Sequence, residues 1–316
     1  MDAVRSHRSV LVILAATLIA ASSGCSRWAT RRTSAFASET PSAGEIIARI
    51  NDNAERAHGL LVNDLDITVH QQGQITVPLD GQLAIEKPRQ FRLIATNPLT
   101  RATEADLGSN AQEFWFYVPR ASQRQQLVHC SYADYGAVQG RLPFQPDWVL
   151  DSLGLTPVPD DPSQIVHPGR RGTVELITPT RTPQGQPASI ITVVQLDTGW
   201  IVERHLDVNG RRIASAVLSR HRADPVHGVI YPGSVAINWP EAQLEIGIRL
   251  DDVQVNPVLP PSMRDNLWRL PQEVLAAGAE DVDLGATARP VRPATPVRPR
   301  GDEGRRGMWR EPRAGR

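Results

Sequence analysis

The feature that most constrains the fold is a series of segments in which apolar and polar residues alternate. Leu65, Ile67 and Val69 alternate with polar neighbours, and the same pattern returns many times along the chain. A period of two predicts β-strands with one apolar face and one polar face. Strands are predicted at 64–70, 75–79, 83–85, 91–95, 113–118, 126–131, 172–177, 189–196, 199–206, 212–220, 234–238 and 244–255.

Short turn signals separate many of these segments. Gln72-Gly73 is a predicted turn, and Asp80-Gly81 is a strong signal for a tight hairpin. Asn209-Gly210 is a further turn between later strands. Successive strands joined by short turns predict an antiparallel meander, because a parallel sheet needs long crossover connections.

Two helices are predicted beside the strands. Ser42 and Glu45 have the spacing of a capping box, which begins a helix that runs to about His58. A second, short helix is predicted from 146 and ends at Gly154. The first helix is amphipathic and needs an apolar surface to cover. Its apolar face is formed by Ile46, Ile47, Ile50, Ala54 and Ala57.

The beginning of the chain has the order of a bacterial export signal. Arg5 and Arg8 precede an apolar run at 10–21, which is shorter than the about 20 residues that span a bilayer. Small residues then lead to Cys25, as in the motif read by lipoprotein signal peptidase, although Ser22 replaces the usual leucine. We therefore predict cleavage before Cys25 and its acylation, which anchors the protein to a membrane. An ordinary signal peptide or an uncleaved anchor helix are the alternatives.

Composition divides the remaining chain into three parts. Residues 25–41 are small and polar and are predicted to be a flexible tether, and 42–275 are predicted to be one folded domain. The Pro/Arg-rich tail at 276–316 is predicted to be disordered, and it either contacts anionic surfaces or is simply solvated. With Cys25 acylated, Cys130 has no partner for an intramolecular disulfide, so stability must come from the core.

Three segments resemble the LolA/LolB-like family of outer-membrane lipoprotein-sorting proteins. Residues 81–92 (GQLAIEKPRQFR) contain a glycine, an apolar strand, a basic residue before proline and then phenylalanine. Residues 114–119 (FWFYVP) match a family strand, and 252–256 (DVQVN) followed by Pro260-Pro261 is similar to the sequences that end the fold. The resemblance covers 43–130 and, more loosely, 170–271.

This resemblance implies an α+β, mainly β fold, in which a curved antiparallel sheet forms an unclosed barrel with helices on its concave face. It also implies an apolar cavity that holds acyl chains, with Lys87 at the position of the lid latch. The family's soluble carrier has an arginine there, whereas lysine offers a point charge instead of a planar fork of donors. A filled core without a cavity is the alternative. The predicted cavity residues are Ile47, Ile50, Phe91, Leu93, Phe114, Phe116 and Val118.

No catalytic motif is recognised, so the chain is predicted not to be an enzyme and to need no cofactor. His129 and Cys130 are adjacent but should point to opposite faces of a strand. His221, Asp224 and His227 do not form a full metal ligand set, so no metal site is predicted.

The sequence thus predicts an envelope lipoprotein, most consistent with an outer-membrane protein that faces the periplasm. Its expected partners are membrane lipid through Cys25 and a lipid or lipoprotein cargo, and no nucleic acid. The alternative is a structural or assembly lipoprotein that uses the same fold to bind an envelope protein.

Overall fold

The computed structural model describes residues 41–72, 76–120, 124–138, 146–182 and 184–288. The predicted signal peptide, Cys25, the tether up to residue 40, the turn glycine Gly73 and the tail from 289 lie outside these ranges. Of the helices in the described residues, none has the length and apolar character needed to cross a membrane.

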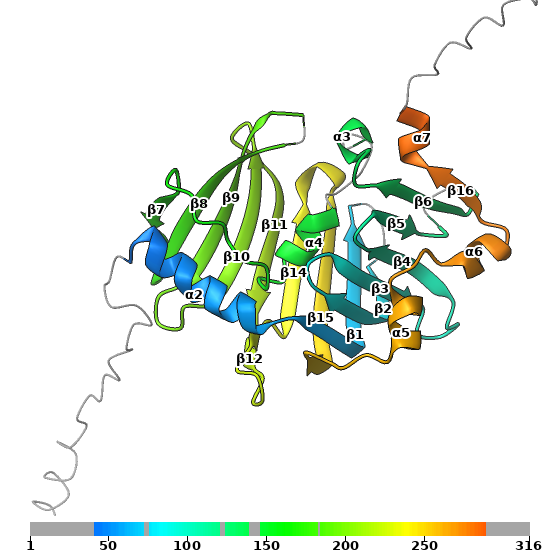
Figure 1. Cartoon of the computed structure of the whole chain (residues 1–316), viewed down its shortest axis with the longest axis horizontal. Coiled ribbons are helices and arrows are strands. Elements are labelled where there is room, and N and C mark those ends of the chain that lie inside the picture. Colours follow the sequence, from blue (N-terminus) through cyan, green and yellow to red (C-terminus); the bar gives the residue numbers. More distant parts are fainter. Residues whose placement is uncertain (1–40, 73–75, 121–123, 139–145, 183, 289–316) are drawn as a thin grey trace, which may run out of the picture.

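Fourteen strands form one continuous, strongly curved sheet (Figure 1). Its order is β16-β6-β5-β4-β3-β2-β1-β15-β14-β11-β10-β9-β8-β7, and the two edge strands do not pair with each other. All neighbours are antiparallel except the parallel pair β16 and β6. The predicted fold class, a curved antiparallel sheet that is not closed into a barrel, is therefore confirmed.

The strand bounds follow the predicted alternation in most places, but the strands at 103–109 and 165–168 were not predicted. The first half contains β1 (Gly59–Gln71), β2 (Val77–Glu86), β3 (Gln90–Thr96), β4 (Thr103–Ser109), β5 (Glu113–Tyr117) and β6 (Gln126–Ser131). The second half contains β7 (Ile165–Pro168), β8 (Thr173–Arg181), β9 (Pro187–Gln195), β10 (Ile201–Val208), β11 (Arg211–Ser219), β14 (Ser234–Trp239) and β15 (Leu244–Val255). β12 (Arg222–Ala223) and β13 (Ile230–Tyr231) form a separate pair, and β16 spans Glu280–Asp283.

Two meanders meet at the middle of this sheet. β2 to β6 form one, and β7 to β11 form most of the other. They are joined by β1 and β15, which pair along their whole length with Leu65 opposite Leu250. Both of these leucines are buried, so this long-range pairing lies within the main core.

The predicted hairpin turn at Asp80-Gly81 is wrong, because both residues lie inside β2. This strand pairs with β1 and β3 on its two sides. A Cβ atom at position 81 would lie 2.8 Å from Ile67 Cδ1 and 3.0 Å from the Ile94 carbonyl oxygen. Glycine is therefore needed here for close packing of neighbouring strands, not for a turn.

The helices lie against the sheet or along its rim (Figure 1). α2 (Ala43–Arg56) begins at Ser42 with the predicted capping box, in which the Ser42 and Glu45 side chains each accept from the other's backbone N–H. The short helices are α3 (Tyr135–Val138), α4 (Pro146–Asp151), the 3-10 helix η2 (Pro240–Ala242), α5 (Pro261–Leu267), α6 (Gln272–Ala276) and α7 (Leu284–Ala288).

The folded part extends beyond the predicted boundary at residue 275. β16 pairs with β6, and α7 follows it directly. Leu284 of α7 packs against the cluster that contains Phe114 and Cys130. Placing the start of a disordered tail at 276 was therefore wrong: four residues with a high acidic content form a short strand because β6 offers an unpaired edge.

α5 and α6 are fastened to the sheet by a buried ion pair. Arg92 donates from Nε and Nη2 to the Asp106 carboxylate at 3.1 and 2.7 Å, and both side chains are buried. Arg92 Nη1 also donates to the Asn266 carbonyl at 2.9 Å, and Nη2 lies 3.4 Å from Glu273. One guanidinium thus links β3, β4 and the C-terminal helices.

Candidate functional site

The apolar concave face of the sheet is covered by two elements, which together we call the lid. The first is α2 and the second is the segment 146–158, which contains α4. The buried face of α2 is formed by Ile46, Ile47, Ile50 and Ala54. The second element contributes Trp148, Leu150, Leu153, Leu155 and Val158 to the same core, which includes residues of β1 to β3, β8 to β11, β14 and β15.

The lid meets the sheet mainly through apolar side chains. Trp148 of the lid packs edge-on against Trp239 of β14, with the ring centroids 6.0 Å apart. Gly154 ends the turn after α4 with a φ of +69°, which is the left-handed region that glycine adopts most easily. Apolar contacts of this kind are not directional, so a mobile apolar ligand could replace them without loss of specific bonds.

Lys87 lies at the predicted latch position and contacts the lid. It stands between β2 and β3, and its Nζ donates a hydrogen bond to the Ala54 carbonyl of α2. Burial lowers the pKa of the Lys87 ammonium below its ordinary value. The lysine therefore makes one bond to the last turn of α2, at a carbonyl that also accepts from the N–H of the C-cap residue Ala57.

Two asparagines of α2 hold the lid with matched pairs of hydrogen bonds. Asn51 Nδ2 donates to the Val158 carbonyl at 2.9 Å, and the Val158 N–H donates to Asn51 Oδ1 at 2.7 Å. Asn53 makes the same pair of bonds with Ile230, again at 2.9 and 2.7 Å. Asn51 joins the two lid elements to each other, whereas Asn53 joins α2 to β13.

Arg204 of the sheet holds the second lid element, segment 146–158, through hydrogen bonds. It lies on β10, and its Nη1 donates to the Asp151 carbonyl at 2.9 Å and to Thr156 Oγ1 at 2.8 Å. The Thr156 hydroxyl in turn donates to the Asp151 carboxylate at 2.7 Å. Burial lowers the pKa of Arg204, and the nearby Asp151 charge opposes this effect.

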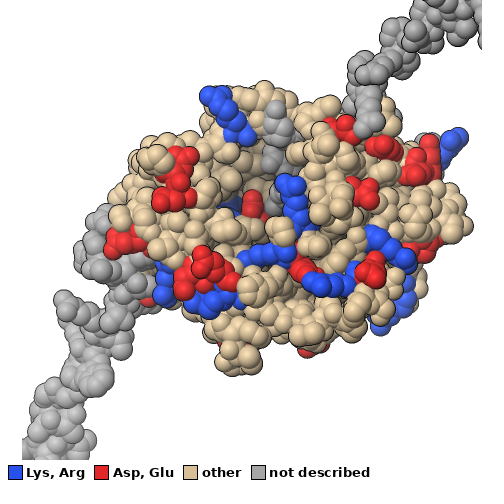
Figure 2. All heavy atoms as spheres, in the orientation of Figure 1, with Lys and Arg blue, Asp and Glu red and all other residues tan. Residues whose placement is uncertain are grey.

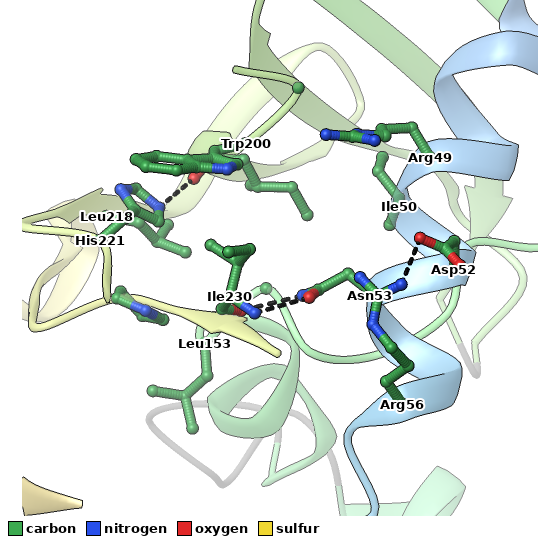
Figure 3. A pocket seen from close by; sticks show the side chains of 14 residues that line it. Arg49, Ile50, Asp52, Asn53, Arg56, Leu153, Trp200, Leu218, His221 and Ile230 are labelled. Atoms are coloured by element: carbon green, nitrogen blue, oxygen red, sulfur yellow. Dashed lines mark hydrogen bonds and ion pairs between the residues drawn. The ribbon is translucent and has the colours of Figure 1, made fainter. Parts of the chain in front are cut away.

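Small cavities border the lid in this closed arrangement. One of about 50 Å³ lies between α2, the β9–β10 turn and the segment before β12 (Figure 3). Figure 3 shows Ile50 and Leu218 facing this cavity, with Arg49 and Trp200 at its rim. A second cavity of about 20 Å³ lies beneath Lys87 and the lid segment. Ligand pockets usually measure about 300–1,000 Å³, so an acyl chain requires the lid to move.

Charged side chains of both signs surround the lid. On the face drawn in Figure 2, basic and acidic residues are interspersed, with broad uncharged areas between them. Arg56 and Asp52 form such a pair on the outer side of α2, at 2.6 Å. Interspersed charge of this kind is typical of a solvated surface.

Four of the predicted cavity residues lie together in the main core. Ile47 and Ile50 of α2 are buried there with Phe91 of β3. Leu93 is partly buried and packs against the same cluster. The structure therefore brings Ile47 and Ile50 of the lid into one apolar cluster with Phe91 and Leu93 of β3.

The other three predicted residues lie elsewhere. Phe114 is fully buried in a separate cluster with Cys130 and Val138, and Phe116 packs against that cluster. Val118 follows the end of β5 and is 37% exposed. Alternation along β5 correctly separates Phe114 from Trp115, which belongs to a cluster with Tyr117 and Leu127. Alternation alone could not show that β5 lies four strands away from β1 in the sheet, and so in a different apolar cluster.

The histidines and the cysteine singled out in the sequence have local partners. His129 Nε2 lies 3.0 Å from Asp281 of β16, whereas Cys130 is buried on the other face. The pKa of the Cys130 thiol is raised to about 11, mainly because the thiol is buried and also because carboxylates lie nearby. His227 pairs with Asp224 at 2.9 Å. Within the described ranges, no group of three or more histidine, cysteine or acidic residues is placed to hold a metal ion.

His221 lines the larger lid cavity and gives a prediction for the pH dependence of stability. Its Nε2 donates to the Ile201 carbonyl at 2.8 Å, and its ring lies 5.2 Å from that of Trp200. Burial lowers the pKa of His221 below its ordinary 6.5, so the folded state favours the neutral ring. The stability contribution is then complete above pH 6.5 and is lost as the pH falls through the folded-state pKa.

We therefore expect His221→Gln, which keeps a donor near Ile201, to reduce the loss of stability between neutral and mildly acidic pH. Urea unfolding at a series of pH values measures this. Burial also lowers the pKa of His205, so part of the loss should persist in the variant. An unchanged pH profile would show that His221 does not contribute.

Sequence reasoning missed Arg204 and the asparagine pairs. Arg204 and Leu206 lie two residues apart on β10, so alternation places the arginine on the same face as a buried leucine. Charged residues are rarely buried, so an arginine on the buried face of a strand could have marked Arg204 as a candidate site residue. Asn51 and Asn53 gave no comparable signal, because polar residues on the flank of an amphipathic helix usually contact water.

The fold and the site together define a lidded, open antiparallel sheet with an apolar concave face. The structure is similar to that of a DUF1329 family protein from Desulfovibrio piger, with a TM-score of 0.46 and 10% identity over 69% of this chain and 93% of that one. An outer membrane lipoprotein-sorting protein domain from Vibrio parahaemolyticus matches with a TM-score of 0.47 and 9% identity, over 71% and 98% of the two chains.

A LolA superfamily protein from Nitrosomonas europaea also matches, with a TM-score of 0.45 and 10% identity over 73% of this chain and 98% of that one. No family model matches the chain, and no curated protein matches it.

Proposed function

We propose that the chain is a non-catalytic envelope lipoprotein that binds lipid, or the acyl chains of lipoproteins, between the lid and the concave face of the sheet, for transfer or sorting. The observation that carries this proposal is the construction of the lid. Two separate elements cover one continuous apolar face, and few side-chain hydrogen bonds hold them there, notably those of Lys87, Asn51, Asn53 and Arg204.

The energies favour such an exchange. Each buried CH₂ group of an acyl chain contributes about 0.8 kcal/mol, so a chain of about 14 methylenes provides roughly 11 kcal/mol. Each hydrogen bond of the lid contributes only about 1 kcal/mol. An acyl chain that replaces the apolar contacts of the lid can therefore offset the loss of several of these bonds.

Membrane anchoring through acylated Cys25 is part of this proposal. The apolar run at 10–21 and the small residues before the cysteine support it. Such an anchor would keep the lipid-binding domain close to a membrane, and we place it at the outer membrane, facing the periplasm. A tether from 25 to about 41 would let the domain reach that membrane surface.

The second candidate is an assembly lipoprotein that binds an envelope protein. The filled core beneath the lid, with cavities of only about 50 and 20 Å³, is the observation that favours it. A permanently closed lid would leave the outer surfaces as the functional part.

Native mass spectrometry of the mature chain, residues 25–316 with Cys25→Ser, distinguishes the two. The protein would be purified from a bacterial host without detergent and then incubated with palmitate. Bound mass equal to fatty acid or phospholipid supports the lipid-binding proposal. A mass that stays that of the bare chain at saturating palmitate contradicts it and favours the assembly role.

Lys87 provides a test of the latch. Lys87→Met keeps the apolar stem but removes the bond to Ala54, so the closed state loses about 1 kcal/mol relative to the open state. We expect palmitate to bind roughly fivefold more tightly, as measured by isothermal titration calorimetry. Lys87→Arg keeps a donor and is the control, with affinity close to that of the wild type. Equal affinities for Lys87→Met and the wild type would contradict a latch role.

A further inference from the structure

The apolar floor beneath the lid contains one buried cation. Arg204 is 4% exposed and lies on the concave side of β10, in line with Leu206 of the main core. Thr192 of β9 is its direct cross-strand partner and is 1% exposed. Val194 lies two residues further along β9 and belongs to the same core. The pair Arg204–Thr192 is thus a polar spot on an apolar surface.

Within the described part of the chain, the hydrogen bonds of Arg204 go to the lid. Its Nη1 bonds the Asp151 carbonyl and the Thr156 hydroxyl, and the Asp151 carboxylate lies 3.7 Å away. Arg204 Nε and Thr192 Oγ1 are both buried and have no hydrogen-bond partner among the described residues. Part of the hydrogen-bonding capacity of this spot is therefore unused even when the lid is closed.

Movement of the lid removes the hydrogen-bond partners of this cation. When segment 146–158 leaves the sheet, Arg204 loses Asp151 and Thr156 together. A guanidinium on an apolar floor that an acyl chain then covers is costly unless an acceptor accompanies the chain. The favoured ligand is therefore one that brings its own acceptor, and an anionic oxygen suits the planar fork of donors best.

We propose that Arg204, assisted by Thr192, binds the anionic head of an acyl ligand, a carboxylate or a phosphate attached directly to the chain. This inference rests on the proposed function, because it assumes that acyl chains enter beneath the lid. The chain of the ligand would extend over the apolar residues beside the pair, Val194, Leu206 and Leu176. The site thus selects for the head of the ligand, and the remaining floor selects for its apolar tail.

The selectivity should be large, because a neutral ligand leaves the guanidinium without a charged partner. A site built to bond a group rejects analogues that lack it far more strongly than an apolar pocket does. We expect hexadecanoate and hexadecyl phosphate to bind about tenfold to hundredfold more tightly than hexadecan-1-ol, which has the same chain length. Comparing the first two ligands shows whether carboxylate or phosphate is preferred.

The experiment measures the affinities of these three ligands by calorimetry at concentrations below those at which each ligand self-associates, with the mature chain carrying Cys25→Ser. Arg204→Met fills a similar volume and removes the charge, and replacing a buried charged group by an apolar one of similar size is often tolerated. We expect this variant to bind all three ligands with similar affinity. Arg204→Lys keeps the charge and should retain a reduced preference for the anions.

A purely structural role for Arg204 predicts a different result. It would change the unfolding temperature of Arg204→Met but would leave the ratio of anion to alcohol affinity unchanged, and this outcome would overturn the inference. Equal binding of all three ligands by the wild type would overturn the inference alone, while the proposed function would stand. Binding of none of them by the wild type would overturn both.

Thr156→Val is the matched control on the lid side. It removes one partner of Arg204 without touching the floor, so the lid should open more easily. We expect all three ligands to bind more tightly by a similar factor, with the preference for anions preserved. Loss of that preference in Thr156→Val would contradict the assignment of the anion site to Arg204.

Discussion

Replacing Asp106 by alanine is expected to lower the free energy of unfolding by about 3–5 kcal/mol, because it leaves a buried guanidinium without its partner. Arg92 holds both carboxylate oxygens of Asp106, and Trp115 Nε1 lies 3.4 Å from one of them. Chemical denaturation followed by circular dichroism measures the change.

The double variant Arg92→Met/Asp106→Leu is the matched control. It removes both charges and fills the space with apolar side chains, so most of the lost stability should return. The double variant also removes the bond to Asn266, so α5 should become more accessible to protease while the sheet remains folded. Equal destabilisation in the single and double variants would show that the charge pairing is not what Asp106 provides.

The asparagines of α2 give the second large effect. Asn51→Ala and Asn53→Ala each remove two hydrogen bonds of the same lengths and leave a backbone N–H and a carbonyl unpaired. We expect each variant to lose about 2–4 kcal/mol of stability. Their effects on the lid should differ, because only Asn51 connects α2 to the segment 146–158.

This difference shows which part of the lid moves. In Asn51→Ala, hydrogen exchange should rise at the amides of Ser152 and Leu153, which bond back to Trp148 and Leu150. Palmitate should also bind about tenfold more tightly, since the same bonds no longer hold the closed state. In Asn53→Ala the exchange at these two amides should stay near the wild type, whereas palmitate should bind more tightly by a smaller factor, because Asn53 holds α2 alone, as Lys87 does. Equal exchange and equal affinity in the two variants would show that the two lid elements open as one unit.

The architecture was largely predictable because most strands have one solvent-exposed face and one buried face. The first helix begins where it was predicted, because the capping box at Ser42 is a local signal, whereas β1 begins five residues before its predicted start at 64. Gly81 misled the prediction, since the sequence cannot distinguish a glycine needed for a turn from one needed for close strand packing. The short acidic strand β16 was missed because its stability comes from the edge of β6, which is distant in the sequence.

The candidate site was less predictable than the fold. Periodicity assigns a residue to a face of the sheet but does not give its distance across that face. Phe91 and Phe114 were therefore expected in one cavity, although they belong to separate clusters. A local motif marks the position of Lys87 in the sequence, whereas its contact with Ala54 depends on the packing of α2.

The pairing of β1 with β15 has a consequence for the order of folding. β2 to β5 pair with strands that are near in sequence, as do β8 to β11, so most of each meander can form from local contacts. β1 and β15, in contrast, come from opposite ends of the domain, and their pairing carries a large loop-closure entropy. During synthesis the N-terminal half forms first and must wait with the long edge of β1 unpaired. The chain is then most exposed to aggregation just before β15 arrives, and a chaperone that covers strand edges would act in that interval.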